Sequence, residues 1–540
     1  MKDKAECLWW QAGVIYQIYP RSFQDTTGNG VGDLCGIIQK LDYLSDTLGV
    51  DAIWISPFYP SPMADFGYDV SDYTGVHPLF GDLATFDELV AQAHQRDLKV
   101  IIDLVPNHSS DQHPWFIESR SSRDNPKRDW YVWRDPKPDG SPPNNWIAVF
   151  GGSAWEWDEA TGQYYLHSFL KEQPDLNWRN PEVKAAMFDA MRFWLERGVD
   201  GFRIDVAHYI MKDPQMRDNP PNPDPKQTTH HRPMGEHDRQ LHLYDKGHPD
   251  VHDVYREFRQ LLDAYSAQSP RMAVGEIHIF DWAEWASYYG EHLDELHMPF
   301  NFALLGVSWR ARPVREVVDS LEAAIPSAAW PNYVLGNHDE SRLASRYGLD
   351  QARVAAMLLL TLRGTPTVYY GDEIGLTDVP IPPEREQDPW GLRQPGFSRD
   401  PCRTPMQWDD SPNAGFSEAE PWLPISDDYA ARNVTAQSAD PTSMLNLYRR
   451  LLGYRRRNPA LYGGSYQPLD AGDDECFVYL READDERCLV ALNFTGEPRR
   501  IAVPGGGEGR VVLSTHLDRE GGVSLAELKL RPHEGVIVEW

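Results

Sequence analysis

Gly201-Phe-Arg-Ile-Asp205 is a short apolar run that carries one arginine and ends on a carboxylate. Three other segments end on similar groups, and they read Asp103-Leu-Val-Pro-Asn-His108, Val274-Gly-Glu276 and Gly336-Asn-His-Asp339. A carboxylate or a histidine at the end of a buried strand costs free energy unless it is paired. Because these groups follow separate strands, we expect them to share one cleft.

Eight apolar, β-branched or aromatic runs recur along the chain, most of them followed by a polar tip and a helix-like stretch. The runs are Val14–Pro20, Ala52–Pro57, Lys99–His108, Gly201–His208, Met272–Ile277, Leu296–Phe302, Asn332–Asp339 and Pro366–Asp372. Helical spacing of apolar residues predicts helices over Leu83–Asp97 and Pro181–Arg197. Alternating strands and helices predict a parallel sheet covered on both faces. Eight such units predict an α/β fold, the closed (β/α)8 TIM barrel, with its active site at the carboxyl ends of the strands.

Long connections divide the chain further. Roughly ninety residues separate the third and fourth runs, and a connection that long is normally a small domain or a lid. We therefore expect residues 1–103 and 176–460 to form the barrel, and residues 104–175 to form an inserted domain. Alternating strands such as Cys476–Leu480 and Cys488–Asn493 predict a C-terminal antiparallel β-sandwich over residues 461–540. The histidine-containing loop Asp213–Asp250 is expected to be solvated, with a metal site as the alternative.

The composition excludes several classes of partner. A net charge of −30, dispersed along the chain, argues against nucleic acid and against an anionic membrane surface. The five cysteines show no C-x-x-C spacing, so reduced thiols are expected, although Cys476 and Cys488 could lie close together. No stretch of eighteen apolar residues occurs, and the N-terminus has no apolar signal core. We expect a soluble cytoplasmic protein, with an unrecognised export signal as the alternative. The oligomeric state is not predicted.

Arg203 and Asp205 point to the same side of a strand, because side chains alternate with a period of two. A buried arginine lowers the pKa of a neighbouring aspartate and keeps it ionised, as a nucleophile requires. A plain buried ion pair is the alternative. Glu276 ends an apolar strand, and desolvation there would raise its pKa, as a general acid requires.

Asp339 follows His338, which could bind a sugar hydroxyl or steady the carboxylate. With His108, these groups would bring several carboxylates and two histidines to one barrel mouth. Such a cluster fits glycoside hydrolysis, in which one carboxylate attacks the anomeric carbon and another protonates the leaving oxygen.

From Val14-Ile-Tyr-Gln-Ile-Tyr-Pro-Arg-Ser-Phe23 to Arg403-Thr-Pro-Met-Gln-Trp-Asp409, the chain resembles the α-amylase family, glycoside hydrolase family 13. The resemblance implies Asp205 as nucleophile, Glu276 as acid/base and Asp339 as transition-state stabiliser. It also implies a subsite for the reacting glucose lined by Arg203, His108 and His338. The family retains the anomeric configuration, so the two carboxyl groups that do the chemistry should lie about 5–5.5 Å apart.

Gln173-Pro-Asp-Leu-Asn177 resembles the motif of the oligo-1,6-glucosidase and α-glucosidase subfamily. In that subfamily, residues matching Asp65 and Tyr68 bind the non-reducing terminal glucose. Arg399 matches a second arginine on that sugar and could pair with Asp65 to close the pocket end, which implies exo action on short substrates. Val206 resembles the α-1,6-preferring members, whereas Thr or Ala at this position resembles the maltose-preferring ones.

The sequence therefore predicts a retaining exo-acting α-glucosidase that takes short oligosaccharides or disaccharides with α-1,6 and α-1,4 linkages. A glucosyltransferase or sucrose isomerase of the same subfamily is the nearest alternative, because the same covalent intermediate serves both. An endo-acting α-amylase and a non-catalytic binding protein on the same fold are the more remote ones.

One loop predicts a metal site. Asp25, Thr27, Asn29 and Asp33 fall at alternate positions, and oxygen ligands at that spacing suit Ca²⁺ or Mg²⁺. The resemblance implies a structural Ca²⁺ here, with the Val31 carbonyl as a further ligand. An ordinary turn rich in Asp and Asn is the alternative. No organic cofactor is expected.

Overall fold

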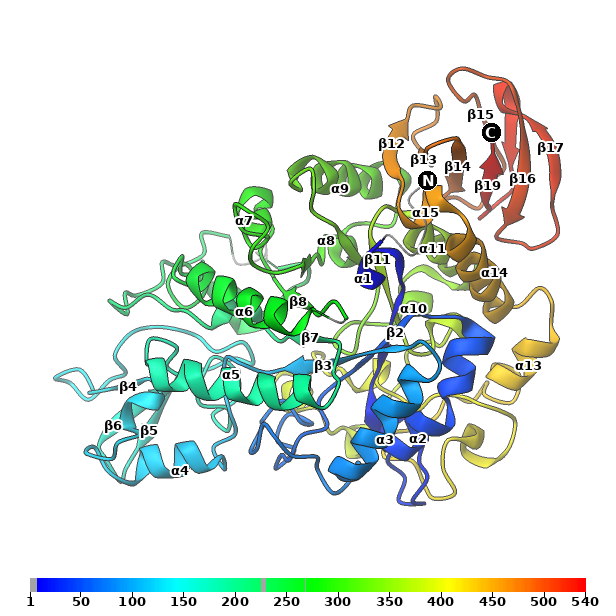
Figure 1. Ribbon diagram of the computed structural model, residues 1–540. Helices are drawn as coiled ribbons and strands as arrows, with labels where there is room; N and C mark the ends of the chain where they lie inside the picture. Colours follow the sequence, from blue (N-terminus) through cyan, green and yellow to red (C-terminus); the bar gives the residue numbers. More distant parts are fainter. Residues whose placement is uncertain (1–6, 225–229, 268) are drawn as a thin grey trace.

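A closed barrel forms the centre of the molecule. The computed structural model describes residues 7–224, 230–267 and 269–540. Within them, eight parallel strands form one sheet in the order β10-β11-β1-β2-β3-β7-β8-β9 (Figure 1). The strands are β1 (Ile15–Ile18), β2 (Ala52–Ile55), β3 (Lys99–Leu104), β7 (Gly201–Ile204), β8 (Met272–Glu276), β9 (Met298–Phe300), β10 (Asn332–Val334) and β11 (Thr365–Tyr369). A parallel bridge between Asn301 and Tyr333 joins the two edges. Seven predicted runs contain a barrel strand, the eighth overlaps β11 from its second residue onward, and the predicted fold is confirmed.

Helices cover the outside of the barrel. The main ones are α2 (Leu34–Gln39), α3 (Leu83–His94), α5 (Pro181–Glu196), α6 (Val251–Tyr265), α9 (Ala311–Ala324), α11 (Leu349–Thr361) and α14 (Met444–Arg457). Shorter ones are α1 (Trp9–Ala12), α7 (Trp282–Ser287), α8 (Ala303–Gly306), α10 (Leu343–Tyr347), α12 (Pro389–Arg393), α13 (Val434–Ala439) and α15 (Pro459–Tyr462). Helix α3 begins where the Asp82 carboxylate accepts a hydrogen bond from the Thr85 amide. It ends before the predicted Asp97, whose φ of 57° is left-handed. No helix in the described ranges is both long and apolar enough to cross a lipid bilayer.

The connection between β3 and α5 carries its own small structure. Helix α4 (Pro114–Ser121) lies beside a three-stranded antiparallel sheet made of β4 (Trp133–Arg134), β6 (Gln163–Leu166) and β5 (Trp155–Asp158). Trp146 and Trp155 are buried within it. Figure 1 shows this unit beside the N-terminal end of α5, away from the C-terminal sheets.

The C-terminal region consists of two antiparallel sheets, as predicted. The larger sheet has the order β12-β13-β14-β19-β16-β17, and β15 pairs with β18 in the smaller one. The strands are β12 (Ser465–Leu469), β13 (Cys476–Ala483), β14 (Glu486–Asn493), β15 (Arg499–Ile501), β16 (Glu508–Ser514), β17 (Gly521–Ser524), β18 (Leu528–Leu530) and β19 (Gly535–Glu539). Along β13, Phe477 and Tyr479 join the main core with the barrel, whereas Val478 packs in a second core with Leu528 of the smaller sheet. This alternation is the period of two that the sequence predicts.

Cys476 and Cys488 do not lie close together. In the β13–β14 pairing, Cys476 is opposite Asn493 and Cys488 is opposite Arg481. The two cysteines are therefore separated by five residues along the sheet, or about 17 Å at the strand rise. All five cysteines have free thiols.

Arg481 connects the C-terminal sheet to the barrel helices. Its side chain is fully buried and donates to the carbonyl oxygens of Ser465 (2.8 Å), Gly464 (3.0 Å) and Leu461 (3.1 Å), and also to that of Thr361 at the end of α11. Each of these carbonyls would lose a buried partner without the guanidinium.

We expect Arg481→Leu to lower the free energy of unfolding by about 3 kcal/mol, because several buried carbonyls lose their donor at once. Urea denaturation followed by tryptophan fluorescence measures this. Arg487→Leu on the neighbouring strand is the matched control, since that side chain is half exposed and pairs with the Glu482 carboxylate. Equal losses in the two variants would contradict the role assigned to Arg481.

Candidate active site

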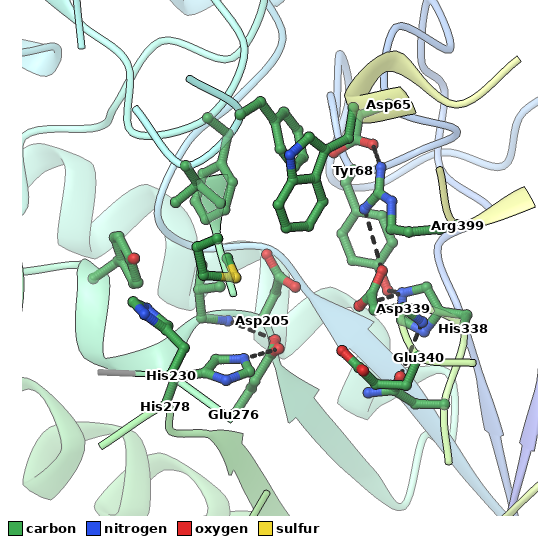
Figure 2. Close-up of a pocket in the computed structure, with 18 of the residues that line it drawn as sticks. Asp65, Tyr68, Asp205, His230, Glu276, His278, His338, Asp339, Glu340 and Arg399 are labelled. Atoms are coloured by element: carbon green, nitrogen blue, oxygen red, sulfur yellow. Dashed lines mark hydrogen bonds and ion pairs between the residues drawn. The ribbon is translucent and has the colours of Figure 1, made fainter. Parts of the chain in front are cut away.

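One pocket lies at the carboxyl ends of the barrel strands. Nine of the residues predicted to act on the substrate line it (Figure 2), and these are Asp65, Tyr68, His108, Asp205, Val206, Glu276, His338, Asp339 and Arg399. Arg203 lies just behind them and is 1% exposed. The loop Asp25–Asp33 contributes no residue to this lining.

Arg203 joins three carboxylates. Its Nη1 donates to Asp103 Oδ1 (2.5 Å) and to Asp205 Oδ1 (2.8 Å), and its Nη2 donates to Glu276 Oε2. The prediction that Arg203 and Asp205 share a face is therefore confirmed. Because Asp205 and Glu276 bind the same guanidinium, their carboxyl groups are held next to each other.

The charges of this pair differ from what the sequence predicts. Desolvation raises the pKa of Asp205 well above its ordinary value, and Arg203 offsets only part of that rise. Desolvation also acts to raise the pKa of Glu276, but the charge of Arg203 and a hydrogen bond from His278 outweigh it, so this pKa is lowered. Both expected directions were wrong for the free site, because Glu276 receives more donors than Asp205.

Val206 has a strained backbone that serves the same pair. Its φ of 36° and ψ of 49° lie in the left-handed region, which is unfavourable for a β-branched residue. In this conformation, its amide donates to Glu276 Oε2 at 3.1 Å. The residue after Asp205 thus touches both the pocket and the second carboxylate.

The far end of the pocket is closed by an ion-pair chain. Arg399 Nη2 lies 2.8 Å from Asp65 Oδ1, and Arg399 Nη1 lies 3.2 Å from Asp339 Oδ1 (Figure 2). The buried carboxylate of Asp388 holds the same guanidinium from behind, at 2.6 Å from Nη2. The ion pair between Arg399 and Asp65, which the sequence analysis considered, is present in the structure.

Asp65 is positioned by a tight loop. The Asp69 carboxylate accepts hydrogen bonds from the Asp65 amide (3.0 Å), the Ala64 amide (2.9 Å) and the Ser61 hydroxyl (2.8 Å). Burial raises the pKa of Asp69 to about 6. Gln173, from the motif after the inserted unit, donates to Asp65 Oδ2 at 3.2 Å.

Tyr68 stacks on a protein ring. Its side chain lies face to face with His338, with ring centroids 5.4 Å apart, and its hydroxyl lies 2.8 Å from His338 Nε2. Gln17 on β1 contacts the other nitrogen, Nδ1, at 2.8 Å. His108 is buried against Gln173, at 3.1 Å from its amide nitrogen, and burial lowers its pKa to about 4. Both histidines are held in fixed orientations.

Part of the loop Asp213–Asp250 forms a wall of the pocket, so the expectation that this loop is solvated was wrong for this part. His230, His231, Arg232 and Met234 line the cavity. His231 Nε2 lies 2.6 Å from a carboxylate oxygen of Glu340. Residues 225–229 of the loop lie outside the described residues. Among the residues that are described, no group of three or more His, Cys, Asp or Glu side chains could hold a metal ion.

Several lining residues were not predicted. They are Val149, Phe150, Phe169, Tyr209, His230, His231, Arg232, Met234, His278, Asn337, Glu340 and Trp390. Most come from long loops, where no periodicity marks a direction. Asn337 and His278 are exceptions. Asn337 lies within the predicted run Asn332–Asp339, and His278 lies two residues after Glu276, so the strand period could have placed His278 and Glu276 on one side. Asp388, behind the lining, follows the eighth strand by many residues and carries no local signal.

Residues 17–464 match the family model described as alpha amylase, catalytic domain. The chain belongs to the α-amylase family of glycoside hydrolases. It is 46% identical over 508 residues to a probable alpha-glucosidase of Rhizobium meliloti (strain 1021), covering 92% of this chain and 91% of the relative. It is 38% identical to an oligo-1,6-glucosidase of Parageobacillus thermoglucosidasius, covering 98% of each.

Two solved structures are similar throughout. The alpha-glucosyl transfer enzyme XgtA superposes with a TM-score of 0.94 at 44% identity, covering 99% of both chains. A variant of the trehalulose synthase MutB gives a TM-score of 0.90 at 36% identity, covering 99% of this chain and 100% of that one. The chain is thus an enzyme of the oligo-1,6-glucosidase and α-glucosidase subfamily.

We expect Asp388→Asn to raise KM for a chromogenic α-glucoside about tenfold, with a smaller change in kcat, because the neutral side chain no longer fixes Arg399 against Asp65. Steady-state kinetics measures both constants. Asp82→Asn, at an exposed helix cap, is the control and should leave both unchanged. A fall in kcat at constant KM would contradict the binding role of this end of the pocket.

Proposed function

We propose that this enzyme is a retaining exo-acting α-glucosidase that releases terminal α-linked glucose from disaccharides and short oligosaccharides. The closed pocket end carries the proposal. With Arg399 paired to Asp65 across it, a sugar ring that reaches Asp205 has little room beyond its non-reducing side. A closed end excludes the interior of a polysaccharide and favours short substrates.

The chemistry follows from the placement of three carboxyl groups. Asp205 attacks the anomeric carbon, and Glu276 gives its proton to the departing oxygen, which leaves a covalent glucosyl-enzyme. Glu276, now a carboxylate, takes a proton from water as the water attacks the same carbon, and Asp205 is released. Asp339, held by Arg399 and Arg403, places negative charge beside the oxocarbenium-like transition state. Two inversions give retention.

The reactive state requires Asp205 ionised and Glu276 protonated, which is the reverse of the directions in the free site. Both groups bind Arg203, so exchanging the proton between them leaves the number of buried charges unchanged. Substrate that contacts Glu276 would favour the protonated form, because the glycosidic oxygen accepts its proton.

For linkage, we propose activity on α-1,6 and also α-1,4 bonds. Val206 supports this, because its side chain lines the pocket at the position where the subfamily's enzymes differ. The curated relatives named oligo-1,6-glucosidase and alpha-glucosidase support it as well. The free thiols support a reducing compartment, and we propose a cytoplasmic location.

Transfer of glucose to an acceptor other than water is the second candidate. The pocket wall beyond the catalytic carboxyls is rich in apolar side chains, namely Val149, Phe150, Phe169, Met234 and Trp390. Such a wall binds an acceptor at the expense of water. The similarity to a glucosyl transfer enzyme and to a trehalulose synthase favours this candidate over the others.

Product analysis tests the proposal. We expect glucose from maltose and isomaltose, glucose alone from long starch, and at least a 10³-fold loss of kcat in Asp205→Asn, because the amide cannot form the ester intermediate. Chromatography of the products of maltose, isomaltose, sucrose, trehalose and trehalulose gives the linkage preference. Val206→Thr on the same substrates should move that preference toward maltose.

The other outcomes are distinct. New disaccharides in place of glucose would establish the transfer reaction. Oligosaccharides from starch would show internal cleavage and contradict the closed pocket. If the natural enzyme turned over none of these sugars, the result would contradict the glucosidase proposal and support a non-catalytic binding protein instead.

We also propose a structural Ca²⁺, with Mg²⁺ as the alternative, in the loop Asp25–Asp33. The donor set fits a hard cation, because it consists of two carboxylates, a hydroxyl, an amide oxygen and the Val31 carbonyl. The loop is also ordered by itself. Asp25 accepts hydrogen bonds from the Gly28 and Gly30 amides, and Asp33 accepts one from Gly36 at the start of α2. With only two carboxylates, the affinity should be modest.

We expect EDTA to lower Tm by a few degrees and leave kcat at 25 °C unchanged, because the loop lies outside the pocket lining. Added Ca²⁺ should restore Tm in the natural enzyme but not in Asn29→Ala. Identical melting curves with and without EDTA would leave the loop as an ordinary turn.

A further inference from the structure

His278 contacts the carboxyl oxygen of Glu276 that must do the chemistry. Glu276 Oε2 faces inward, where it accepts hydrogen bonds from Arg203 and from the Val206 amide. Oε1 is therefore the oxygen left to meet a leaving group. Figure 2 shows the His278 ring beside it, with Nε2 at 2.7 Å. His278 itself lines the pocket.

The ring of His278 is held in one orientation. It stacks on Phe302 with the centroids 4.5 Å apart and the planes at 9°, and it lies against His231 at 5.4 Å. Packing of this kind restricts rotation about the side chain. The hydrogen bond from His278 to Glu276 is thus made by a side chain that is fixed by packing in the pocket wall.

The partners of the ring indicate which nitrogen carries the proton. Nδ1 of His278 is buried and, among the described residues, has no hydrogen-bond partner. A buried N–H without an acceptor is rarer than an acceptor without a donor. The neutral ring therefore keeps its hydrogen on Nε2 and donates it to Oε1.

The titratable and charged groups around the pair decide its charge state. Those that face it are Arg203, Asp205, His208, His230, His231, Lys246 and Asp339. Burial lowers the pKa of His278, the carboxylate of Glu276 offsets this only in part, and His231 and Lys246 lower it further. The ring is therefore neutral at pH 7, and Arg203 supplies the positive charge next to Glu276.

We infer that His278 is a positioning residue for Glu276, which donates from Nε2 to Oε1 so that this oxygen stays aimed into the pocket and the carboxylate is favoured. The inference rests on the proposed function of Glu276 as acid/base. Its consequence lies in the second half-reaction, where Glu276 must be ionised to take the proton from water or from an acceptor.

The test is the pH profile of kcat for maltose, which reports the enzyme–substrate complex. Its alkaline limb follows loss of the Glu276 proton in that complex, so removing a donor to the carboxylate raises that pKa and moves the limb upward. We expect a shift of about one pH unit in His278→Leu, which is a tenfold change in proton affinity. His278→Gln should restore the limb, because its amide N–H can replace Nε2–H.

His252→Leu is the matched control. His252 also lies 2.7 Å from a buried carboxylate, that of Glu295, but it does not line the pocket. This variant should leave the limb in place, and Tm of every variant is measured alongside. An unmoved limb in a folded His278→Leu, or the same shift in His278→Gln, overturns the inference.

Glu276→Ala separates this failure from failure of the proposed function. With a nitrophenyl α-glucoside, azide should accelerate this variant at least tenfold, because azide attacks the glucosyl-enzyme without a base. Rescue by azide with an unmoved limb in His278→Leu means that the function stands and the inference is wrong. Without rescue, the role of Glu276 is wrong, and the inference falls with it.

Discussion

Arg203 is a buried cation shared by three carboxylates, and the rest of the site depends on it. Its partners Asp103, Asp205 and Glu276 come from the ends of three adjacent barrel strands, so the guanidinium sets the spacing of the carboxyl groups. One positive charge cannot balance three negative ones in a dry site. Burial accordingly raises the pKa of Asp103 to about 6. Removing one partner of such a cluster typically costs 3–5 kcal/mol.

Arg399 likewise holds several buried carboxylates together at the other end of the pocket. It joins Asp65, Asp339 and Asp388, which belong to two loops and the segment after β10. The two arginines thus hold opposite walls, and each fixes carboxylates whose mutual repulsion would otherwise push them apart. The space between them is rigid because both guanidinium groups are buried and each binds three carboxylates, which is the preorganisation that charge stabilisation requires.

The sequence predicted the barrel and the pocket lining that comes from strand ends. A buried strand is visible in the sequence as a continuous apolar run, and in a barrel the polar residues at the carboxyl ends of all strands point to the same mouth. It also predicted Asp65 and Arg399, but only through a family resemblance, since neither follows a strand. It could not place His231, which lies in a loop, or Trp390, which lies in the five-residue helix α12, because segments this irregular or short show no periodicity. The charge states of Asp205 and Glu276 were missed for a different reason. They depend on how many donors each oxygen receives, which is a three-dimensional quantity.

Strand ends and loops contribute to different parts of the pocket. Residues from strand ends surround the proposed position of the reacting sugar, whereas the opposite wall comes from the long connections and includes Met234, Glu340 and Trp390 of α12. In the proposed mechanism, the barrel therefore fixes the groups that act on the glucosyl carbon, and the loops decide between water and another acceptor. His278 stands between the two, because it lies two residues after the end of β8 and contacts both Glu276 and the loop residue His231. A change in that loop can therefore reach Glu276, the proposed acid/base, through one stacked ring and without altering the carboxylates themselves.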